Sequence, residues 1–185
     1  MSTTLAQNET SATAREGMAA SEASARIAAA WEALRSVEDP EIPAVSIVDL
    51  GLIRYVKAGP NGALEVGLSP TYVGCPATEV IRRSAREALA KSAVGKFEVT
   101  NVLSPAWSSD WITPEGRRKL HAYGIVPPDR AVSNMREVLR SQQPIACPRC
   151  QSLDTETLSE FGSTPCKALH RCRACLEPFE YFKCI

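Results

Sequence analysis

The sequence predicts an α/β (α+β) protein in which a small mixed sheet with packed helices precedes a small metal-bound β module of the zinc-ribbon type. Apolar and polar residues alternate over Leu64–Leu68, and a helical repeat follows directly after Pro76. Two Cys-x-x-Cys pairs close to the C-terminus indicate the metal-bound module. A chain of 185 residues has room for one domain of ordinary size and one small one.

Composition divides the chain into four segments. Residues 1–20 are rich in Ser, Thr, Ala, Glu and Gln and lack the large apolar residues that offset ordering entropy, so we expect a disordered tail. The α/β domain is expected over residues 21–128, and a polar linker over 129–144. The four-cysteine module is expected over residues 145–185, where a small core needs a metal to fold.

The first predicted element is an amphipathic helix that begins near Ser21. Its apolar residues recur at helical spacing, and together they form one face: Ile27, Ala30, Trp31, Leu34 and Val37. Two prolines in residues 38–43 end it.

Three strands are expected next. A β-branched, apolar stretch over Val45–Val56 pairs antiparallel with the strand at Leu64–Leu68, because Asn61-Gly62 between them is a strong hairpin-turn signal. A further strand is expected over residues 97–103.

A tryptophan-containing loop and a short helix follow the last of these strands. Thr113 and Pro114 are the residue types that cap and begin a helix. Trp107 and Trp111 either cover the edge of the sheet or form a partner-binding surface, where aromatic residues are enriched.

Cys75 stands where the strand at Leu64–Leu68 leads into the next helix. Proline suits a first helical position, so we expect the helix to begin at Pro76, with Cys75 at its N-cap. There the positive end of the helix dipole favours a thiolate over a thiol. The alternative is a small apolar side chain packed under a loop.

The charge balance and the cysteine pattern restrict the classes of function. The chain has 21 basic and 21 acidic residues, so no net field attracts a nucleic acid or an anionic membrane. Seven cysteines, four of them in Cys-x-x-Cys pairs, favour metal ligation in a reducing compartment over a disulfide framework. We find no signal peptide and no transmembrane run, and expect a cytoplasmic protein without nucleic-acid or membrane partners.

The C-terminal module has the two-knuckle pattern of a zinc ribbon. Its expected ligands are Cys147, Cys150, Cys172 and Cys175. We favour structural zinc, but four thiolates also hold a single iron or an iron-sulfur cluster. Zinc would leave Cys166 and Cys184 as spare thiols, whereas a cluster could recruit one of them.

Several motifs together resemble a known family. Asp39-Pro-Glu-Ile, Ile47-Val-Asp-Leu-Gly-Leu-Ile and Thr71-x-x-Gly-Cys-Pro are similar to the iron-sulfur assembly domain of SufT-like and PaaD-like proteins. The PaaD-like group is further indicated by Ser104-Pro-Ala-Trp-x-x-Asp-Trp-Ile, by Phe161-Gly-Ser-Thr-x-Cys-Lys-Ala-Leu and by the ribbon cysteines.

The resemblance implies an iron-sulfur assembly domain over residues 21–128 with a reactive cysteine. Carried over by motif, that cysteine is Cys75, which would bind iron or a cluster transiently, and Asp39, Glu41, Asp49 and Thr71 would support it. From the residues alone, Asp39 has the composition of a turn and Asp49 can serve as a backbone cap.

The PaaD-like group is encoded with the multicomponent phenylacetyl-CoA epoxidase. The resemblance therefore implies an accessory or maturation factor for that oxygenase in phenylacetate degradation, with the epoxidase subunits or their iron-sulfur reductase as partners. One cysteine cannot supply the four sulfur ligands of a cluster, which favours transfer over storage. A second copy of the chain could complete the ligand set in a homodimer.

Two other functions remain open. A non-catalytic structural subunit of the oxygenase would have no role in metal transfer. A thiol-dependent enzyme would use Cys75 as its nucleophile and would need a base, for which the chain offers only His121 and His170. The sequence favours an assembly or carrier protein over an enzyme without deciding between them.

Overall fold

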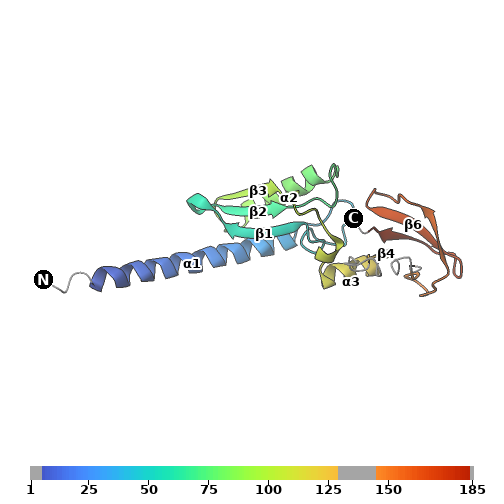
Figure 1. Ribbon diagram of the computed structural model, residues 1–185, viewed down its shortest axis with the longest axis horizontal. Coiled ribbons are helices and arrows are strands. Elements are labelled where there is room, and N and C mark those ends of the chain that lie inside the picture. The colour runs from blue at the N-terminus through green and yellow to red at the C-terminus, as the bar shows by residue number, and fades with distance from the viewer. Residues whose placement is uncertain (1–5, 129–144, 184–185) are drawn as a thin grey trace.

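The computed structural model describes residues 6–128 and 145–183, with side chains from Ala20 onward. It confirms the predicted fold class: a mixed α/β domain is followed by a β module that carries four clustered cysteines (Figure 1). The expected linker at 129–144 lies outside the described residues, so the predicted domain boundaries there stay predictions. No helix in the described parts of the chain is long and apolar enough to cross a membrane.

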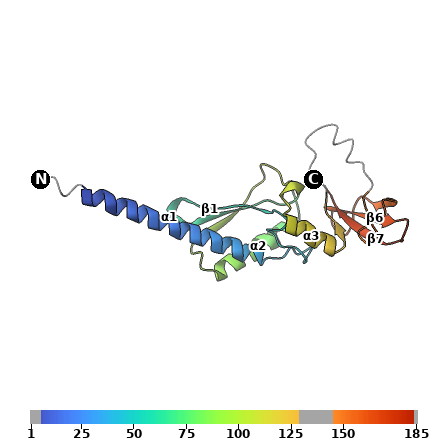
Figure 2. The ribbon, with the colours of Figure 1, turned by 90° about the horizontal axis from the view of Figure 1, so that it is seen from below.

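Helix α1 spans Ala6–Arg35 and therefore begins well before Ser21. The segment expected to be a disordered tail is helical from Ala6 on, and this part projects beyond the sheet (Figure 2). Alanine, glutamate and arginine have high helix propensity, so the chain extends the packed helix although it lacks large apolar residues there. The predicted apolar face is confirmed in the packed half, where Ala30 and Leu34 are fully buried.

The first sheet has three strands in the order β1-β2-β3. Strand β1 (Ile53–Ala58) pairs antiparallel with β2 (Leu64–Leu68), and β2 pairs parallel with β3 (Phe97–Asn101). A parallel pair needs a crossover, which is made by helix α2 (Thr78–Lys91). The expected antiparallel hairpin and the third strand are confirmed.

The hairpin turn uses the residues that the sequence indicated. Asn61 and Gly62 both have positive φ, 66° and 70°, within the 3-10 turn η1 (Pro60–Gly62). Asparagine and glycine accept this left-handed conformation at low cost, which explains why the chain reverses there.

Residues 45–52 form turns rather than the first half of a strand, so the expected strand at Val45–Val56 is wrong over this part. Ser46 and Asp49 cap each other: each side chain accepts the backbone N–H of the other at 3.0 Å. Gly51 has φ +66°, and a Cβ there would lie 2.3 Å from the Trp111 carbonyl oxygen. Val45, Ile47, Leu50 and Leu52 are nevertheless buried, which is why the pattern resembled a strand.

Helix α3 (Pro114–Ala122) begins as predicted. Thr113 is its N-cap, and the Thr113 side chain accepts the Gly116 N–H at 2.9 Å. The 3-10 turn η2 (Ser109–Trp111) precedes it. Trp107 is buried and donates its Nε1–H to the Leu50 carbonyl at 3.0 Å, so it packs the domain instead of forming a free aromatic surface.

The second sheet contains the ribbon and has the order β4-β7-β6-β5. Strands β5 (Thr155–Ser159), β6 (Lys167–Cys172) and β7 (Pro178–Phe182) pair antiparallel in sequence. Strand β4 (Ile125–Val126), which follows α3, adds parallel to β7. The sheet of the ribbon thus includes a strand from the preceding domain. Cys166 and Phe182 of the ribbon in turn lie in the hydrophobic core cluster of that domain.

Candidate metal-binding pocket and four-cysteine site

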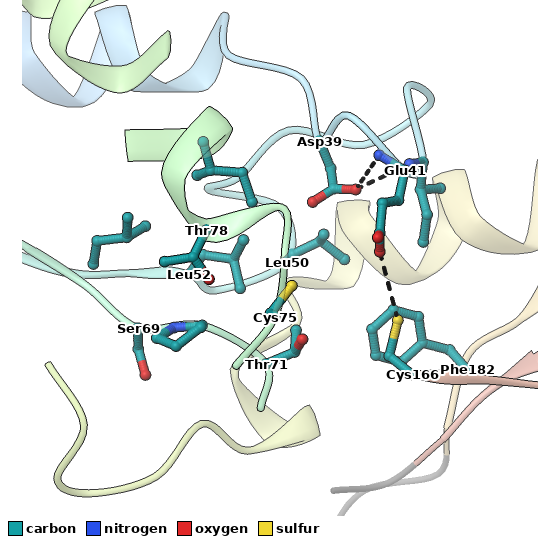
Figure 3. Close-up of a pocket in the computed structure, with 14 residues that line it drawn as sticks. Asp39, Glu41, Leu50, Leu52, Ser69, Thr71, Cys75, Thr78, Cys166 and Phe182 are labelled. Atoms are coloured by element: carbon teal, nitrogen blue, oxygen red, sulfur yellow. Dashed lines mark hydrogen bonds between the residues drawn. The ribbon is translucent and has the colours of Figure 1, made fainter. Parts of the chain in front are cut away.

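A small pocket lies between the α/β domain and the ribbon (Figure 3). Its cavity volume is about 20 Å³, enough for a water molecule or an ion and far too small for an organic substrate. Most of its walls are apolar, and its polar and sulfur-bearing residues are Asp39, Glu41, Ser69, Thr71, Cys75, Thr78 and Cys166. The structure therefore brings Cys75 and three of its predicted supporting residues, Asp39, Glu41 and Thr71, to one place, together with Cys166, one of the two thiols that the sequence left as spare.

Cys75 lies in the turn before α2, not at its N-cap. The helix begins at Thr78, and its N-cap is Ala77, which makes no side-chain capping bond. The Cys75 carbonyl accepts the Thr78 N–H at 3.2 Å, so the turn winds into the helix after the proline. Cys75 therefore lies two residues before the N-cap at which it was expected. The expectation that the first helical N–H groups stabilise its thiolate has no geometric basis. The half-buried side chain lines the pocket instead.

Asp39 and Glu41 come from the turn after α1. Asp39 Oδ1 accepts the backbone N–H groups of Glu41 and Ile42, both at 2.9 Å. This confirms the turn that composition indicated and holds Asp39 in place. Burial raises the pKa of Asp39 despite these hydrogen bonds. Burial, followed by the nearby charge of Asp39, also raises the pKa of Glu41. Both carboxyl groups therefore lie where a bound cation would stabilise their charged forms.

Cys166 enters the pocket from the ribbon, immediately before β6. Its Sγ lies 4.0 Å from Glu41 Oε2 and 3.0 Å from Thr164 Oγ1. Figure 3 shows Cys166 and Phe182 approaching from the ribbon while Asp39, Glu41 and Cys75 come from the α/β domain. Burial, which is the largest effect, and the Glu41 charge raise the pKa of Cys166.

Tyr72 interacts with Cys75 beside the pocket. Burial, the charge of Cys75 and a hydrogen bond with it raise the pKa of Tyr72 to about 12, with smaller effects of Glu41 and Cys166. The tyrosine thus stays a neutral phenol near two sulfurs and a carboxylate. Tyr72 was not among the predicted site residues, because a tyrosine within Thr71-x-x-Gly-Cys-Pro carries no distinct signal in one sequence.

Asp49 does not line this pocket. Besides capping Ser46, it forms a salt bridge with Lys119 of α3, with 2.7 Å between Nζ and Oδ2. Burial alone would raise the pKa of Asp49, but the hydrogen bonds from Lys119 and Ser46 outweigh it and lower the pKa. Asp49 therefore holds the turn at residues 45–52 against α3, which is the backbone-cap role that the sequence allowed.

Neither histidine lies in the pocket. His121 is exposed on α3. His170 is buried on β6, where it stacks on Phe179 with ring centroids 5.6 Å apart. Neither histidine is therefore placed to act as the base that a nucleophilic Cys75 would need.

The four ribbon cysteines converge as predicted. The Sγ atoms of Cys147, Cys150, Cys172 and Cys175 all lie within 4.8 Å of one another. Two of the separations are 3.7 Å (Cys147–Cys175) and 3.6 Å (Cys150–Cys172). A tetrahedral zinc site with Zn–S bonds of about 2.3 Å has S···S edges of about 3.8 Å. The four sulfurs therefore fit a zinc-ribbon metal site. Cys184, the other spare thiol, lies outside the described residues.

Family models match both parts of the chain. Residues 27–104 match the model of the iron-sulfur cluster assembly proteins, and residues 131–183 match the PaaD zinc beta ribbon domain. Fold and site together therefore define an iron-sulfur assembly domain followed by a four-cysteine ribbon. With these matches and a relative that is 46% identical over most of its length, the chain belongs to the PaaD family.

That relative, from Escherichia coli K12, bears the name of a putative 1,2-phenylacetyl-CoA epoxidase subunit. The match spans 155 residues, 84% of this chain and 91% of the relative. The Fe-S protein maturation auxiliary factor YitW of Bacillus subtilis is 37% identical over 79 residues, 42% of this chain and 76% of that protein. A domain of unknown function, DUF59, from Bacillus anthracis superposes with a TM-score of 0.50 and 29% identity, covering 55% of this chain and 96% of the domain.

Proposed function

We propose that this protein is an accessory factor that supplies or repairs iron, or an iron-sulfur cluster, for the multicomponent phenylacetyl-CoA epoxidase in phenylacetate degradation. The name of the Escherichia coli relative supports the link to the epoxidase, and the assembly-domain match supports the link to iron-sulfur chemistry. The observation that carries the proposal is the position of Cys75, whose side chain lines an ion-sized pocket beside two carboxylates.

The ligand set in the α/β domain favours transfer over storage. An iron-sulfur cluster is held by about four sulfur ligands, and Cys75 is the only cysteine of that domain. Asp39 and Glu41 contribute oxygen atoms, which hold iron less firmly than a full set of thiolates. A site of this kind binds its cargo and releases it to a partner with a more complete ligand set.

The other residues of the family motifs have supporting roles in this proposal. Thr71 lines the pocket beside Cys75. Asp49 acts indirectly, because its bonds to Ser46 and Lys119 fix the turn that carries the pocket residue Leu50.

The ribbon is the proposed partner-recognition module, with structural zinc on its four cysteines. Zinc would crosslink the two knuckles and hold β6, which follows Cys166, and β7, which ends at Phe182, toward the α/β domain. The recipient is an epoxidase subunit or the iron-sulfur reductase of the complex.

The test is anaerobic co-expression of this protein with the epoxidase subunits and their reductase. Iron and acid-labile sulfide are measured in each purified component, together with turnover of phenylacetyl-CoA. We expect Cys75→Ser to lower the iron content of one component at least several-fold and turnover in proportion. Glu79→Gln, an exposed substitution in the first turn of α2, the helix that follows Cys75, is the matched control and should leave both unchanged.

Two outcomes would overturn the proposal. Full metallation and full turnover with Cys75→Ser would identify a structural subunit of the oxygenase. Full metallation with lost turnover would instead indicate a thiol-dependent enzyme. The absence of a histidine from the pocket speaks against the second outcome.

A further inference from the structure

We propose that the recipient protein docks in a second groove, next to the Cys75 pocket, by inserting one large uncharged side chain. This groove, called the Trp107 groove below, is lined by residues 69–73 and by Leu103, Ala106 and Trp107. The inference rests on the proposed function, since it takes the occupant to be the protein that receives the cargo of Cys75. It adds a contact on the α/β domain to the partner recognition assigned to the ribbon.

The size and the lining of the Trp107 groove suit an apolar side chain. Its cavity volume is about 240 Å³. That is far more than one water molecule needs and less than the about 300–1,000 Å³ of most small-molecule sites. None of its lining residues carries a charge, whereas a groove along α2 is lined by three arginines and two glutamates. A charged segment would lose hydration in the Trp107 groove without gaining an ionic partner, so the occupant is uncharged there.

Two exposed apolar side chains line the Trp107 groove from different loops. Val73 follows β2 and is 85% exposed, and Leu103 follows β3 and is 60% exposed. Strands β2 and β3 are parallel neighbours, so the loops that follow them emerge at the same end of the sheet. Single exposed apolar residues are ordinary, but two that line one concave apolar surface are typical of a protein-binding site.

An unsatisfied hydroxyl in the Trp107 groove is an independent indication of an occupant. Ser69 is 1% exposed, and its Oγ has no hydrogen-bond partner among the described residues. Figure 3 shows this hydroxyl turned away from Cys75 and Asp39, and Ser69 lines the Trp107 groove as well. Buried hydroxyl groups nearly always have a partner. A serine side chain moves between staggered rotamers, so a backbone N–H or C=O group of the inserted segment can pair with it.

The walls of the Trp107 groove are held in place before any partner binds. Trp107 donates its Nε1–H to the Leu50 carbonyl at 3.0 Å. The Ser69 N–H donates to the Leu52 carbonyl at 2.8 Å, which fixes the chain directly after β2. A preformed groove loses little conformational entropy on binding, which favours affinity for the segment that fits it.

Tyr72 connects the Trp107 groove to Cys75. The Tyr72 side chain lines the groove and hydrogen-bonds with the Cys75 sulfur. The Cys75 N–H also donates to the Tyr72 carbonyl at 3.3 Å. A segment seated against Tyr72 is therefore separated from the sulfur by one side chain. Docking there would bring the ligands of the recipient close to the cargo, as transfer requires.

The first test is photo-crosslinking of the full chain, co-expressed with the epoxidase subunits and their reductase. The photoreactive residue p-benzoylphenylalanine replaces Leu103 in one variant and Ala58 in the control. Ala58 is exposed at the end of β1, beside the hairpin turn that precedes β2, whereas the Trp107 groove follows β2. We expect the Leu103 variant to crosslink to one of these components, at a segment with a large uncharged side chain, and the Ala58 variant not to crosslink.

The second test measures the affinity for that component by calorimetry. Leu103→Asp should weaken binding at least about tenfold, as loss of an anchoring contact does. Ser69→Ala should weaken it about two- to tenfold, which corresponds to one hydrogen bond. In the free protein Ser69→Ala should keep or raise the thermal stability, because the hydroxyl has no partner to lose. Ala58→Asp adds the same charge outside the groove and should bind as wild type.

Wild-type affinity in Leu103→Asp or in Ser69→Ala would overturn the inference. So would a Leu103 variant that crosslinks to no component, or only to a second copy of this chain. A clear loss of stability in free Ser69→Ala would show that the hydroxyl is satisfied within the chain, and would remove the independent indication of an occupant. The proposed function is tested separately, because full metallation of the epoxidase with Cys75→Ser overturns it whatever the groove variants do.

Discussion

Trp107 packs its ring against Phe182, with ring centroids 5.9 Å apart and planes inclined by 53°. Trp107 belongs to the loop before η2, whereas Phe182 is the last residue of β7. Phe182 also lines the Cys75 pocket and is 1% exposed. This pair therefore fixes the ribbon to the α/β domain at the place where the two share the pocket.

Removal of the Phe182 ring should destabilise the protein. We expect Phe182→Ala to lower the free energy of unfolding by about 3–5 kcal/mol, because the substitution leaves a cavity in the core. Phe161→Ala is the matched control in the same ribbon: its ring is 66% exposed, and the Lys183 ammonium group lies 4.5 Å from the ring centroid. The control should cost less than about 1 kcal/mol.

Urea denaturation followed by tryptophan fluorescence measures both variants, since Trp107 reports on this contact. Equal losses for the two phenylalanines would contradict the role of Phe182 at the junction.

Loss of the ribbon metal should unfold the ribbon and spare the first sheet. Cys147 is fully buried and contributes one of the four sulfurs, so Cys147→Ser should abolish stoichiometric zinc and remove amide protection from residues 155–182. Strands β1, β2 and β3 have their own core and should keep their protection. Hydrogen exchange read by mass spectrometry distinguishes the two regions.

Arg149→Ala is the control for this experiment. Arg149 stands between the two cysteines of the first knuckle and forms an exposed salt bridge with Glu177, of the kind that contributes little to stability. Its loss should leave zinc content and exchange unchanged. Protection of the ribbon in metal-free Cys147→Ser would show that the sheet folds without metal.

Acid should weaken the contact between Asp49 and Lys119. The folded pKa of Asp49 is lowered, so its contribution is complete above the unfolded pKa of about 3.9 and is lost as the pH falls through the folded value. At pH 7 we expect Asp49→Asn to lower the free energy of unfolding by about 1–2 kcal/mol, a range reduced because Lys119 is partly exposed. The deficit should shrink as the pH drops below about 4.

Thermal unfolding across a pH series checks this prediction, with Lys119→Met as the partner variant. The double variant should be little worse than either single one, because both remove the same interaction. A deficit that stays constant down to about pH 2 would argue that Asp49 contributes packing and not charge.

Local signals predicted much of the fold. The Asn61-Gly62 turn, the Thr113 cap and the apolar face of α1 depend on neighbouring residues, and the structure confirms all three. The wrong predictions concern local sequence patterns that are compatible with two different secondary structures. Buried apolar residues at 45–52 occur in turns as well as in strands, and a proline after Cys75 fits a turn as well as a first helical position.

The two-part architecture, the four ribbon ligands and the choice of Cys75 as a candidate could be deduced from the chain alone, because they follow from periodicity, from paired cysteines and from family motifs in contiguous segments. The folded structure was needed to show that Cys166 shares the Cys75 pocket and that Asp49 does not. Cys166 and Glu41 are 125 residues apart in the chain, and they meet because β7 packs Phe182 against Trp107. Contacts of this kind depend on how the packed faces of two domains fit, which no local pattern records.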